Sequence, residues 1–282
     1  GRDPDAVYDF SVGGPAASFG IWHEYVDEVL AIAQEHDLTI NSMHTHIGSG
    51  SDPEVWERVA LMSLEICSRF PNATTLSLGG GYKVGRMQGE GATDLQQIGP
   101  HVVEAFSMFE GQYGRRLTLE VEPGTFLVAN AGVLVASVID VVDTGQDGYA
   151  FIKVDTGMTE LTRPSLYGSQ HPIVVVSAKG GHRGTREYII SGHCCESGDV
   201  LTPAPDDPEG LQVRELTEAQ TGDLVVIGGA GAYCAAMSTK NYNSFPEAAE
   251  VLLADDGRLH LVRERQTLAQ VVQNEVVPEF LA

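Results

Sequence analysis

Three times in its first half, the chain alternates a helical pattern with a short apolar run that ends in polar or glycine residues. Apolar side chains recur at helical spacing over residues 22–36, 53–66 and 98–109, and the apolar runs cover residues 39–43, 74–78 and 117–121. Asp52-Pro53 predicts the start of the second helix, and the third helix is expected to start or be interrupted near Pro100. This alternation predicts a parallel α/β sheet, whose functional residues lie at the carboxyl ends of the strands. Three such units are too few to close an eight-stranded barrel. The sheet is therefore open, or further strands precede it.

The second half of the chain has a different pattern. Runs rich in β-branched residues cover 133–142, 149–154, 172–176, 188–190 and 224–227, with Gly, Pro and Asp between them. The sequence Asp-Asp-Gly, with Gly257, separates two further apolar runs and indicates a hairpin. We therefore expect an α/β domain over residues 1–132 and a mostly antiparallel β domain over residues 133–282.

Composition limits the classes of partner. The formal net charge is −22, and the acidic residues occur throughout both halves, which disfavours binding to nucleic acid or to anionic membranes. No apolar run reaches the length of about 18 residues that a membrane span needs, and the opening residues lack the apolar core of a signal peptide. The four cysteines form no C-x-x-C motif, which fits a reducing cytoplasm better than a disulfide-stabilised secreted protein.

Each predicted strand of the first half runs into residues that suit a binding site. Gly79, Gly80 and Gly81 have no side chains, so their backbone N–H groups can approach an anion, and Ser49 lies in the loop after the preceding strand. His44 and His46 are two residues apart at a strand end, and we expect their side chains to point to opposite sides. Glu122 ends the third strand. Each feature alone also has an ordinary explanation: a tight turn, a core histidine, or a carboxylate that caps backbone donors.

Taken together, the three strand ends match the needs of pyridoxal 5'-phosphate. The glycine and serine loops offer a cradle for its phosphate, an imidazole can stack on its ring, and a carboxylate can keep the pyridine nitrogen protonated. The second half adds three polar clusters after apolar runs, at Cys194–Asp199, at Gly231-Ala-Tyr233 and at Arg163-Pro-Ser-Leu-Tyr167. A buried cysteine, a packed tyrosine or a solvated arginine would explain each cluster by itself.

Six blocks of the chain resemble, in order, the signature blocks of diaminopimelate decarboxylases, which belong to the alanine-racemase-like barrel class of pyridoxal-dependent enzymes. The blocks are His46-Ile-Gly-Ser-Gly, Gly79-Gly-Gly-Tyr, Glu122-Pro-Gly, Arg163-Pro-Ser-Leu-Tyr, Cys195-Glu-Ser-Gly-Asp and Gly231-Ala-Tyr, and the stretches at Ser18, Ala235 and Asn241 also fit. The resemblance implies the C-terminal part of a (β/α)8 barrel of the TIM type followed by a β domain. It also implies a homodimer that makes L-lysine from meso-diaminopimelate as the last step of lysine biosynthesis.

The resemblance also implies a role for each site residue. His46 would stack on the cofactor ring, Ser49 and Gly79, Gly80 and Gly81 would bind its phosphate together with Tyr233, and Glu122 would face the pyridine nitrogen. Cys195 would enter the partner subunit's active site and reprotonate the carbon that loses CO2. Arg163, Tyr167 and Glu196 would hold the far end of the substrate, where Arg163 pairs with a carboxylate and Glu196 with an ammonium.

Two departures from the family pattern affect what we expect of the chain. Thr125 stands where the family has an arginine after Glu-Pro-Gly, and none of the four lysines, Lys83, Lys153, Lys179 and Lys240, lies in the family's block for the lysine that carries the cofactor as a Schiff base. We therefore expect an N-terminally truncated chain that is inactive by itself.

Three alternatives remain open at this point. His44-x-His46 also suits a metal-dependent hydrolase, which would need further ligands on later strand ends. A non-catalytic homologue would explain Thr125 and the missing lysine. A decarboxylase for ornithine, arginine or carboxynorspermidine would share most of the blocks, although the pairing of Arg163 with Glu196 favours diaminopimelate.

Overall fold

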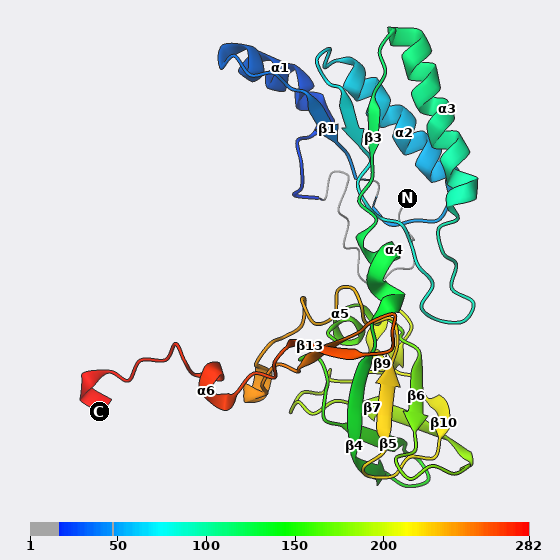
Figure 1. The fold of residues 1–282 in the computed structure, drawn as a ribbon, viewed down its shortest axis with the longest axis vertical. Helices are drawn as coiled ribbons and strands as arrows, with labels where there is room; N and C mark the ends of the chain where they lie inside the picture. The colour runs from blue at the N-terminus through cyan, green and yellow to red at the C-terminus, as the bar shows by residue number, and fades with distance from the viewer. Residues whose placement is uncertain (1–16, 47, 282) are drawn as a thin grey trace. The chain divides into compact units, whose positions relative to one another are not determined.

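The computed structural model describes residues 17–46 and 48–281 and divides them into two compact units, 17–128 and 129–281 (Figure 1). The sequence placed the domain boundary a few residues later, after Gly132. Residues 1–16 of the expected first domain lie outside the described residues. Each unit is described by itself below.

The first unit alternates helices with short strands. Its elements are η1 (His23–Tyr25), α1 (Val26–Glu35), β1 (Ser42–His44), α2 (Pro53–Ser68), β2 (Thr75–Ser77), α3 (Leu95–Tyr113), β3 (Thr118–Glu120) and α4 (Gly124–Val128). The three strands form a parallel sheet in the order β1-β2-β3. The expected α/β alternation is thus present, and the carboxyl ends of all three strands lie at the same edge of the sheet.

Local sequence explains where the two long helices begin. The Asp52 side chain accepts a hydrogen bond from Glu54 N at 2.9 Å, with Pro53 in the first turn, as the sequence predicted. Asp94 caps α3 in the same way through Gln96 N. The sequence placed a helix start or break near Pro100, which was wrong, because the Asp94 cap starts the helix earlier and the helix continues through the proline.

The core of the first unit lies between the sheet and its two long helices. Leu76 and Leu78 are fully buried against α2 and α3, which contribute Leu64, Cys67 and Phe109. A second small cluster packs Trp56 on Tyr82, with ring centroids 4.5 Å apart. Of the three strands, only the central β2 is buried, whereas all three residues of β3 are exposed.

The second unit is built mainly of strands. Its elements are η2 (Ala129–Ala131), β4 (Leu134–Asp143), β5 (Ala150–Val154), α5 (Arg163–Tyr167), β6 (Ile173–Val176), β7 (Thr185–Ser191), β8 (Pro203–Ala204), β9 (Asp207–Leu211), β10 (Arg214–Thr217), β11 (Leu224–Ile227), η3 (Tyr242–Ser244), β12 (Glu250–Leu253), β13 (Leu259–Arg263), α6 (Leu268–Val271) and η4 (Glu279–Leu281).

Six of these strands form one sheet in the order β10-β7-β5-β4-β11-β6. Its pairs are antiparallel except β5 with β7, which run parallel. The edge strands β6 and β10 approach each other, so the sheet is nearly closed. The mostly antiparallel β domain that the sequence predicted is therefore present.

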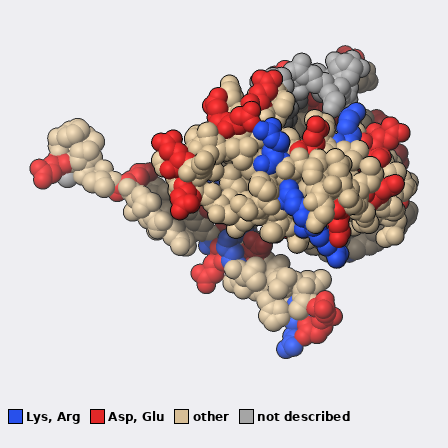
Figure 2. All heavy atoms as spheres, turned by 90° about the horizontal axis from the view of Figure 1, so that it is seen from above, with Lys and Arg blue, Asp and Glu red and all other residues tan. Residues whose placement is uncertain are grey.

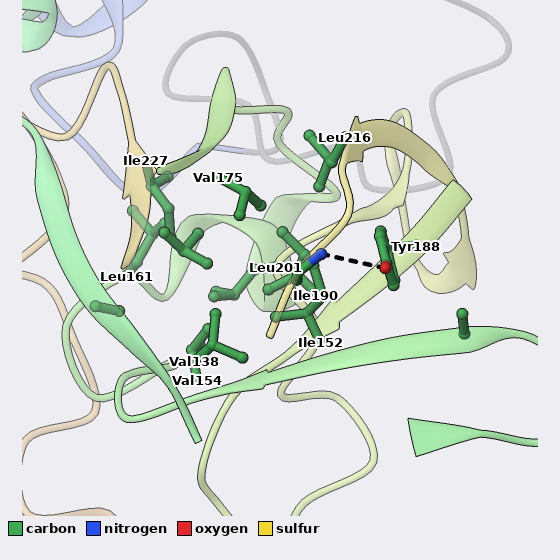
Figure 3. Packing of buried hydrophobic residues seen from close by; sticks show 14 of the residues in the cluster. Val138, Ile152, Val154, Leu161, Val175, Tyr188, Ile190, Leu201, Leu216 and Ile227 are labelled. Atoms are coloured by element: carbon green, nitrogen blue, oxygen red, sulfur yellow. Dashed lines mark hydrogen bonds between the residues drawn. The ribbon is translucent and has the colours of Figure 1, made fainter. Parts of the chain in front are cut away.

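The interior of this sheet holds the largest core of the chain. Figure 3 shows Ile152, Ile190, Leu201 and Ile227 pointing toward one another, and each of them is almost completely buried. The one polar contact drawn there is the Tyr188 hydroxyl, which accepts a hydrogen bond from Ala219 N at 3.3 Å. The β5 and β7 strands that carry this core lead directly into the polar clusters described below.

Two further observations concern the surface. Red acidic residues are scattered over the face shown in Figure 2 and do not form a single patch, as the sequence suggested. Among the described residues, no helix is both long and apolar enough to cross a membrane.

The predicted hairpin is present as β12 and β13, with Gly257 at φ 80° in its turn.

Candidate active site

The loops after β1, β2 and β3 are joined by main-chain hydrogen bonds. Gly50 N donates to Gly81 O at 3.1 Å, and Glu122 N donates to Gly79 O at 2.9 Å. Gly50 also forms a parallel bridge with Tyr82. The triple-glycine loop therefore lies between the Gly-Ser-Gly loop on one side and Glu122 on the other.

The triple glycine is required by close contacts on both sides. A Cβ atom at Gly80 would lie 2.6 Å from Glu122 O, and one at Gly81 would lie 1.8 Å from Gly48 O. Gly79 and Gly81 also have φ values of 69° and 90°, which side chains with a Cβ rarely adopt. No larger residue fits here without moving a neighbouring loop, so the glycines are more than a flexible turn.

Glu122 takes part in a small polar network. Its Oε1 accepts a hydrogen bond from Ser77 Oγ at 2.9 Å and lies 3.3 Å from His44 Nε2. Ser77 Oγ in turn accepts from Gly79 N at 3.1 Å. Ser77 and His44 thus orient the carboxylate that the sequence singled out.

His44 and His46 both lie beside the glycine loop. A Cβ atom built on Gly79 would be 2.7 Å from His46 Nδ1 and 3.1 Å from His44 Nε2. The expectation that the two rings point to opposite sides is wrong, because residues two apart on an extended chain lie on the same face. The side chain of His44 is also 53% exposed, so it is not a core histidine.

The electrostatic environment favours a neutral His46 ring. Partial desolvation, followed by the neighbouring His44, lowers the pKa of His46, while the Glu122 carboxylate opposes this shift. A neutral imidazole at physiological pH presents an uncharged face to an aromatic ring. This fits stacking better than cation–π binding does.

Two side chains donate hydrogen bonds to the loop that carries Ser49. Trp56 Nε1 and Thr93 Oγ1 both donate to Gly50 O, at 3.2 and 3.0 Å. Ser49 itself is exposed, and its Cα would lie 3.4 Å from a Cβ atom on Gly81. Ser49 and the glycine loop therefore adjoin each other, as residues that bind one anion together would have to.

These residues fit a phosphorylated pyridine. Gly79 N is used by Ser77, but in the described part of the chain no group accepts a hydrogen bond from the N–H of buried Gly80 or of Gly81. Two free backbone donors beside a serine hydroxyl suit a phosphate. An imidazole and a carboxylate lie at the neighbouring strand ends, as a pyridine ring with a basic nitrogen would need.

In the second unit, the parallel pairing of β5 with β7 brings two polar segments to one edge of the sheet. Asp199, which is buried, joins them: its carboxylate accepts from Met158 N at 2.7 Å, after β5, and from Cys194 N at 2.9 Å, after β7. A Cβ atom at Gly157 or Gly192 would lie within 2.3 Å of this carboxylate. Asp199 therefore fixes how the two segments meet.

The predicted substrate-binding residues lie on these two segments. Arg163 begins α5, where its Nη2 donates to Ser169 Oγ at 3.2 Å while its buried Nε has no hydrogen-bond partner among the described residues. Tyr167 follows one helical turn later and is 36% exposed. Glu196 Oε1 accepts from Gly198 N at 3.1 Å, which contributes most to lowering its pKa.

The two neighbouring cysteines differ. Cys195 is exposed, and its N–H donates to Asn243 Oδ1 at 2.7 Å. Burial and the neighbouring Asp199 raise the pKa of Cys194 to about 12, so its thiol stays protonated. Of the two, Cys195 is the more exposed.

Tyr233 comes from a separate part of the second unit. It is 58% exposed and has φ 56°, and it follows Gly231, whose N–H donates to Ala129 O at 2.9 Å. A Cβ atom on Gly132 would lie 2.5 Å from Gly231 Cα, so this turn packs tightly on the start of the unit.

Several supporting residues escaped sequence reasoning. Ser77 could have been noticed as a hydroxyl in an apolar strand directly before the glycines, and Asp199 as the last residue of the Cys-Glu-Ser-Gly-Asp block. Asn243 and Tyr242 carried no signal beyond their block. Among the described residues, no three His, Cys, Asp or Glu side chains are grouped as metal ligands would be.

The chain resembles known proteins over most of its length. It is 36% identical to the diaminopimelate decarboxylase of Escherichia coli K12 over 271 residues, which are 95% of this chain and 63% of that protein. A crystal structure of diaminopimelate decarboxylase matches with a TM-score of 0.87 at 37% identity, over 93% of this chain and 62% of that one. The Helicobacter pylori enzyme complexed with L-lysine matches with a TM-score of 0.77 at 26% identity, over 92% and 60%.

The chain thus spans less than two-thirds of the length of these relatives. Residues 6–231 also match the family described as "Pyridoxal-dependent decarboxylase, C-terminal sheet domain". This match covers most of both units and includes the glycine loop, Glu122 and the Cys195 segment. On this evidence, the chain belongs to the family of pyridoxal-dependent decarboxylases.

Proposed function

We propose that this chain binds pyridoxal 5'-phosphate at the strand ends of its first unit and contributes to the conversion of meso-diaminopimelate to L-lysine in a protein that also carries the family lysine. The observation that carries the proposal is the convergence of the Ser49 loop, the glycine loop, His46 and Glu122. When bound, the cofactor supplies an electron sink for the bond that breaks. The relatives of known name and the Helicobacter structure with L-lysine support this substrate and product.

Each residue then has a defined task. Gly80 N–H, Gly81 N–H and the Ser49 hydroxyl would bind the phosphate, with the Tyr233 hydroxyl as a further donor. His46 would lie against the ring, and Glu122, oriented by Ser77 and His44, would hold the proton at the pyridine nitrogen. Cys195 would deliver a proton to the substrate carbon, while Arg163, Tyr167 and Glu196 would bind the far carboxylate and ammonium.

Cofactor binding is the most direct test. Replacing Gly81 with Ala forces the loop away from Gly48 O, so we expect the affinity of the chain for pyridoxal 5'-phosphate to fall at least about tenfold, measured by absorbance titration. The matched control is Gly111→Ala in α3, where an added Cβ meets nothing within 4 Å. Equal affinities for the two variants would contradict the proposed cradle.

Covalent attachment is tested separately. Lys153 and Lys240 are paired with Asp140 and Glu247, at 3.7 and 2.7 Å, and none of the four lysines lies in the family's lysine block. We expect borohydride reduction of the chain with its cofactor to leave no stoichiometric lysine adduct, and we expect no CO2 release from this chain alone. A lysine-dependent absorbance band after cofactor addition would contradict both expectations.

We also propose a cytoplasmic homodimer with shared active sites, because the family resemblance places Cys195 and Glu196 in the partner's site and all four cysteines are free thiols. Subunit mixing tests this in the protein that carries this chain and the family lysine. Mixed Cys195→Ala and Glu122→Gln subunits should recover about a quarter of the activity. No recovery would mean that each site is complete within one subunit.

Release of CO2 from ornithine but not from meso-diaminopimelate would overturn the substrate assignment.

A further inference from the structure

The segment Asn241–Phe245 follows the Tyr233 turn and contacts the Cys195 segment through three of its residues. Tyr242 Oη donates to Glu196 Oε2 at 3.2 Å, Asn243 Oδ1 accepts from Cys195 N at 2.7 Å, and Phe245 stacks on His193. The two rings in this stack are 3.6 Å apart and 7° from parallel. Each contact reaches a different residue of the segment from His193 to Glu196.

The backbone of this segment is unusual. Asn241, Asn243 and Ser244 have φ values of 59°, 51° and 64°, although none of them is glycine. Left-handed conformations cost free energy for residues with a Cβ, least for Asn. Asn241 is itself held, because its Nδ2 donates to Phe245 O at 3.0 Å. The conformation is thus maintained by contacts, and it presents Tyr242 and Asn243 toward the residues that the proposed function uses.

The His193 ring, on which Phe245 stacks, is also held in place. His193 Nε2 lies 2.7 Å from Thr159 Oγ1, and Thr159 contacts the buried Glu160 carboxylate, which Thr156 Oγ1 also reaches at 3.0 Å. Phe245 therefore stacks on a ring that is itself held in place. The segment Asn241–Phe245 therefore packs against a fixed ring, and its other contacts can restrain the more exposed Cys195 and Glu196.

We propose that Asn243 and Tyr242 are positioning residues, which hold the Cys195 backbone and the Glu196 carboxylate in the orientation that decarboxylation requires. This inference rests on the proposed function, in which Cys195 delivers the proton and Glu196 binds the substrate's far ammonium. Asn243 acts on the chemical step through the backbone that carries the thiol. Tyr242 acts on substrate binding, because its hydroxyl occupies one side of Glu196 Oε2 and limits the orientations of that carboxylate.

The first measurement does not depend on activity. In Asn243→Gly the left-handed backbone is retained without strain, but the acceptor for Cys195 N–H is lost. We expect the Cys195 amide of the chain to exchange with solvent about 2- to 10-fold faster, measured by NMR. Asn243→Asp keeps an acceptor oxygen and should restore slow exchange. Unchanged exchange in Asn243→Gly, with the same melting temperature, would overturn the role of Asn243.

The second measurement separates binding from chemistry in the active protein that carries this chain. Asn243→Gly should lower kcat with little change in KM, and Asn243→Asp should recover most of the loss. Tyr242→Phe should raise KM for meso-diaminopimelate with little change in kcat. Equal effects of both variants on kcat and KM would overturn the assignment. Faster Cys195 exchange in a protein that neither binds the cofactor nor decarboxylates would leave the positioning contact intact and refute the proposed function instead.

Discussion

In the 17–128 unit, main-chain hydrogen bonds between strand ends hold the site residues, whereas in the 129–281 unit a buried carboxylate, Asp199, does so. The first arrangement depends on parallel strands in register and on glycines that allow close approach. The second depends on one side chain that bridges two segments. The comparison teaches that the two units should fail in different ways when they are altered.

Asp199→Ala should have the largest effect on stability. It removes the acceptor of the part-buried donors Met158 N and Cys194 N, and leaving both donors unsatisfied costs up to roughly 2–6 kcal/mol. We expect the free energy of unfolding, measured with urea, to fall by that amount. Asp147→Ala, at an exposed turn, is the control and should stay within about 0.5 kcal/mol of the unaltered chain. A loss below about 1 kcal/mol for Asp199→Ala would mean that backbone pairing fixes both units.

Leu76→Ala tests whether one buried strand supports the first unit. Leu76 is completely buried in the centre of the sheet, so truncation should cost about 2–5 kcal/mol. Leu119 on β3 is 39% exposed, and Leu119→Ala should cost much less. Trp56 fluorescence reports on unfolding of this unit. Similar losses for the two variants would show that β3 is buried to the same degree as β2 in solution.

The acid stability of the second unit depends on a different side chain. Hydrogen bonds from Arg183, Gln220 and Ala178 lower the pKa of Asp223 from its ordinary 3.8 to about 2. Asp223 is buried, so its ionised form should contribute about 2 kcal/mol of stability above pH 4.

That contribution should be lost as the pH falls from about 4 through 2, because the unfolded chain binds the proton more readily than the folded chain does. Urea unfolding between pH 5 and 2 would measure it. In Asp223→Asn this part of the pH dependence should disappear. A loss of equal size in Asp223→Asn would assign the acid sensitivity to other carboxylates.

The smallest expected effect concerns His46. Its lowered pKa means that the folded chain disfavours the protonated ring, so this residue's contribution to stability should decrease as the pH falls below about 6.5. NMR titration should show a midpoint below 6.5. His44→Ala should raise the midpoint by removing a like charge, and Glu122→Gln should lower it. Opposite signs would place the rings differently from the arrangement described above.

Sequence patterns predicted most elements of the fold. Periodicity and the Asp52-Pro53 start located α2, and β-branched runs located β4, β5, β6 and β11. Two expectations drawn from local patterns were wrong. Pro100 lies inside α3 because the Asp94 cap begins the helix upstream, and His44 and His46 lie together because residues two apart on an extended chain share a face.

The site was predictable to the extent that residue types have distinctive chemistry. Glycines, histidines and Glu122 at strand ends could be recognised, and the structure brings them together. The sequence offered only a weak signal for Ser77 and Asp199, and none for Asn243 beyond its block, because their importance comes from long-range contacts. Ser77 meets Glu122 across 45 positions, and Asn243 meets Cys195 across 48, so no local pattern reveals either pair.

The glycine loop has one more consequence. Gly80 and Gly81 approach the backbone of two different loops, at Glu122 O and Gly48 O, through atoms that have no rotamers to adjust. A side chain could rotate to accommodate a small shift of a neighbouring loop. A glycine backbone in direct contact with that loop has to move with it. The three loops should therefore move together, and an error in the placement of any one of them reaches the whole anion cradle.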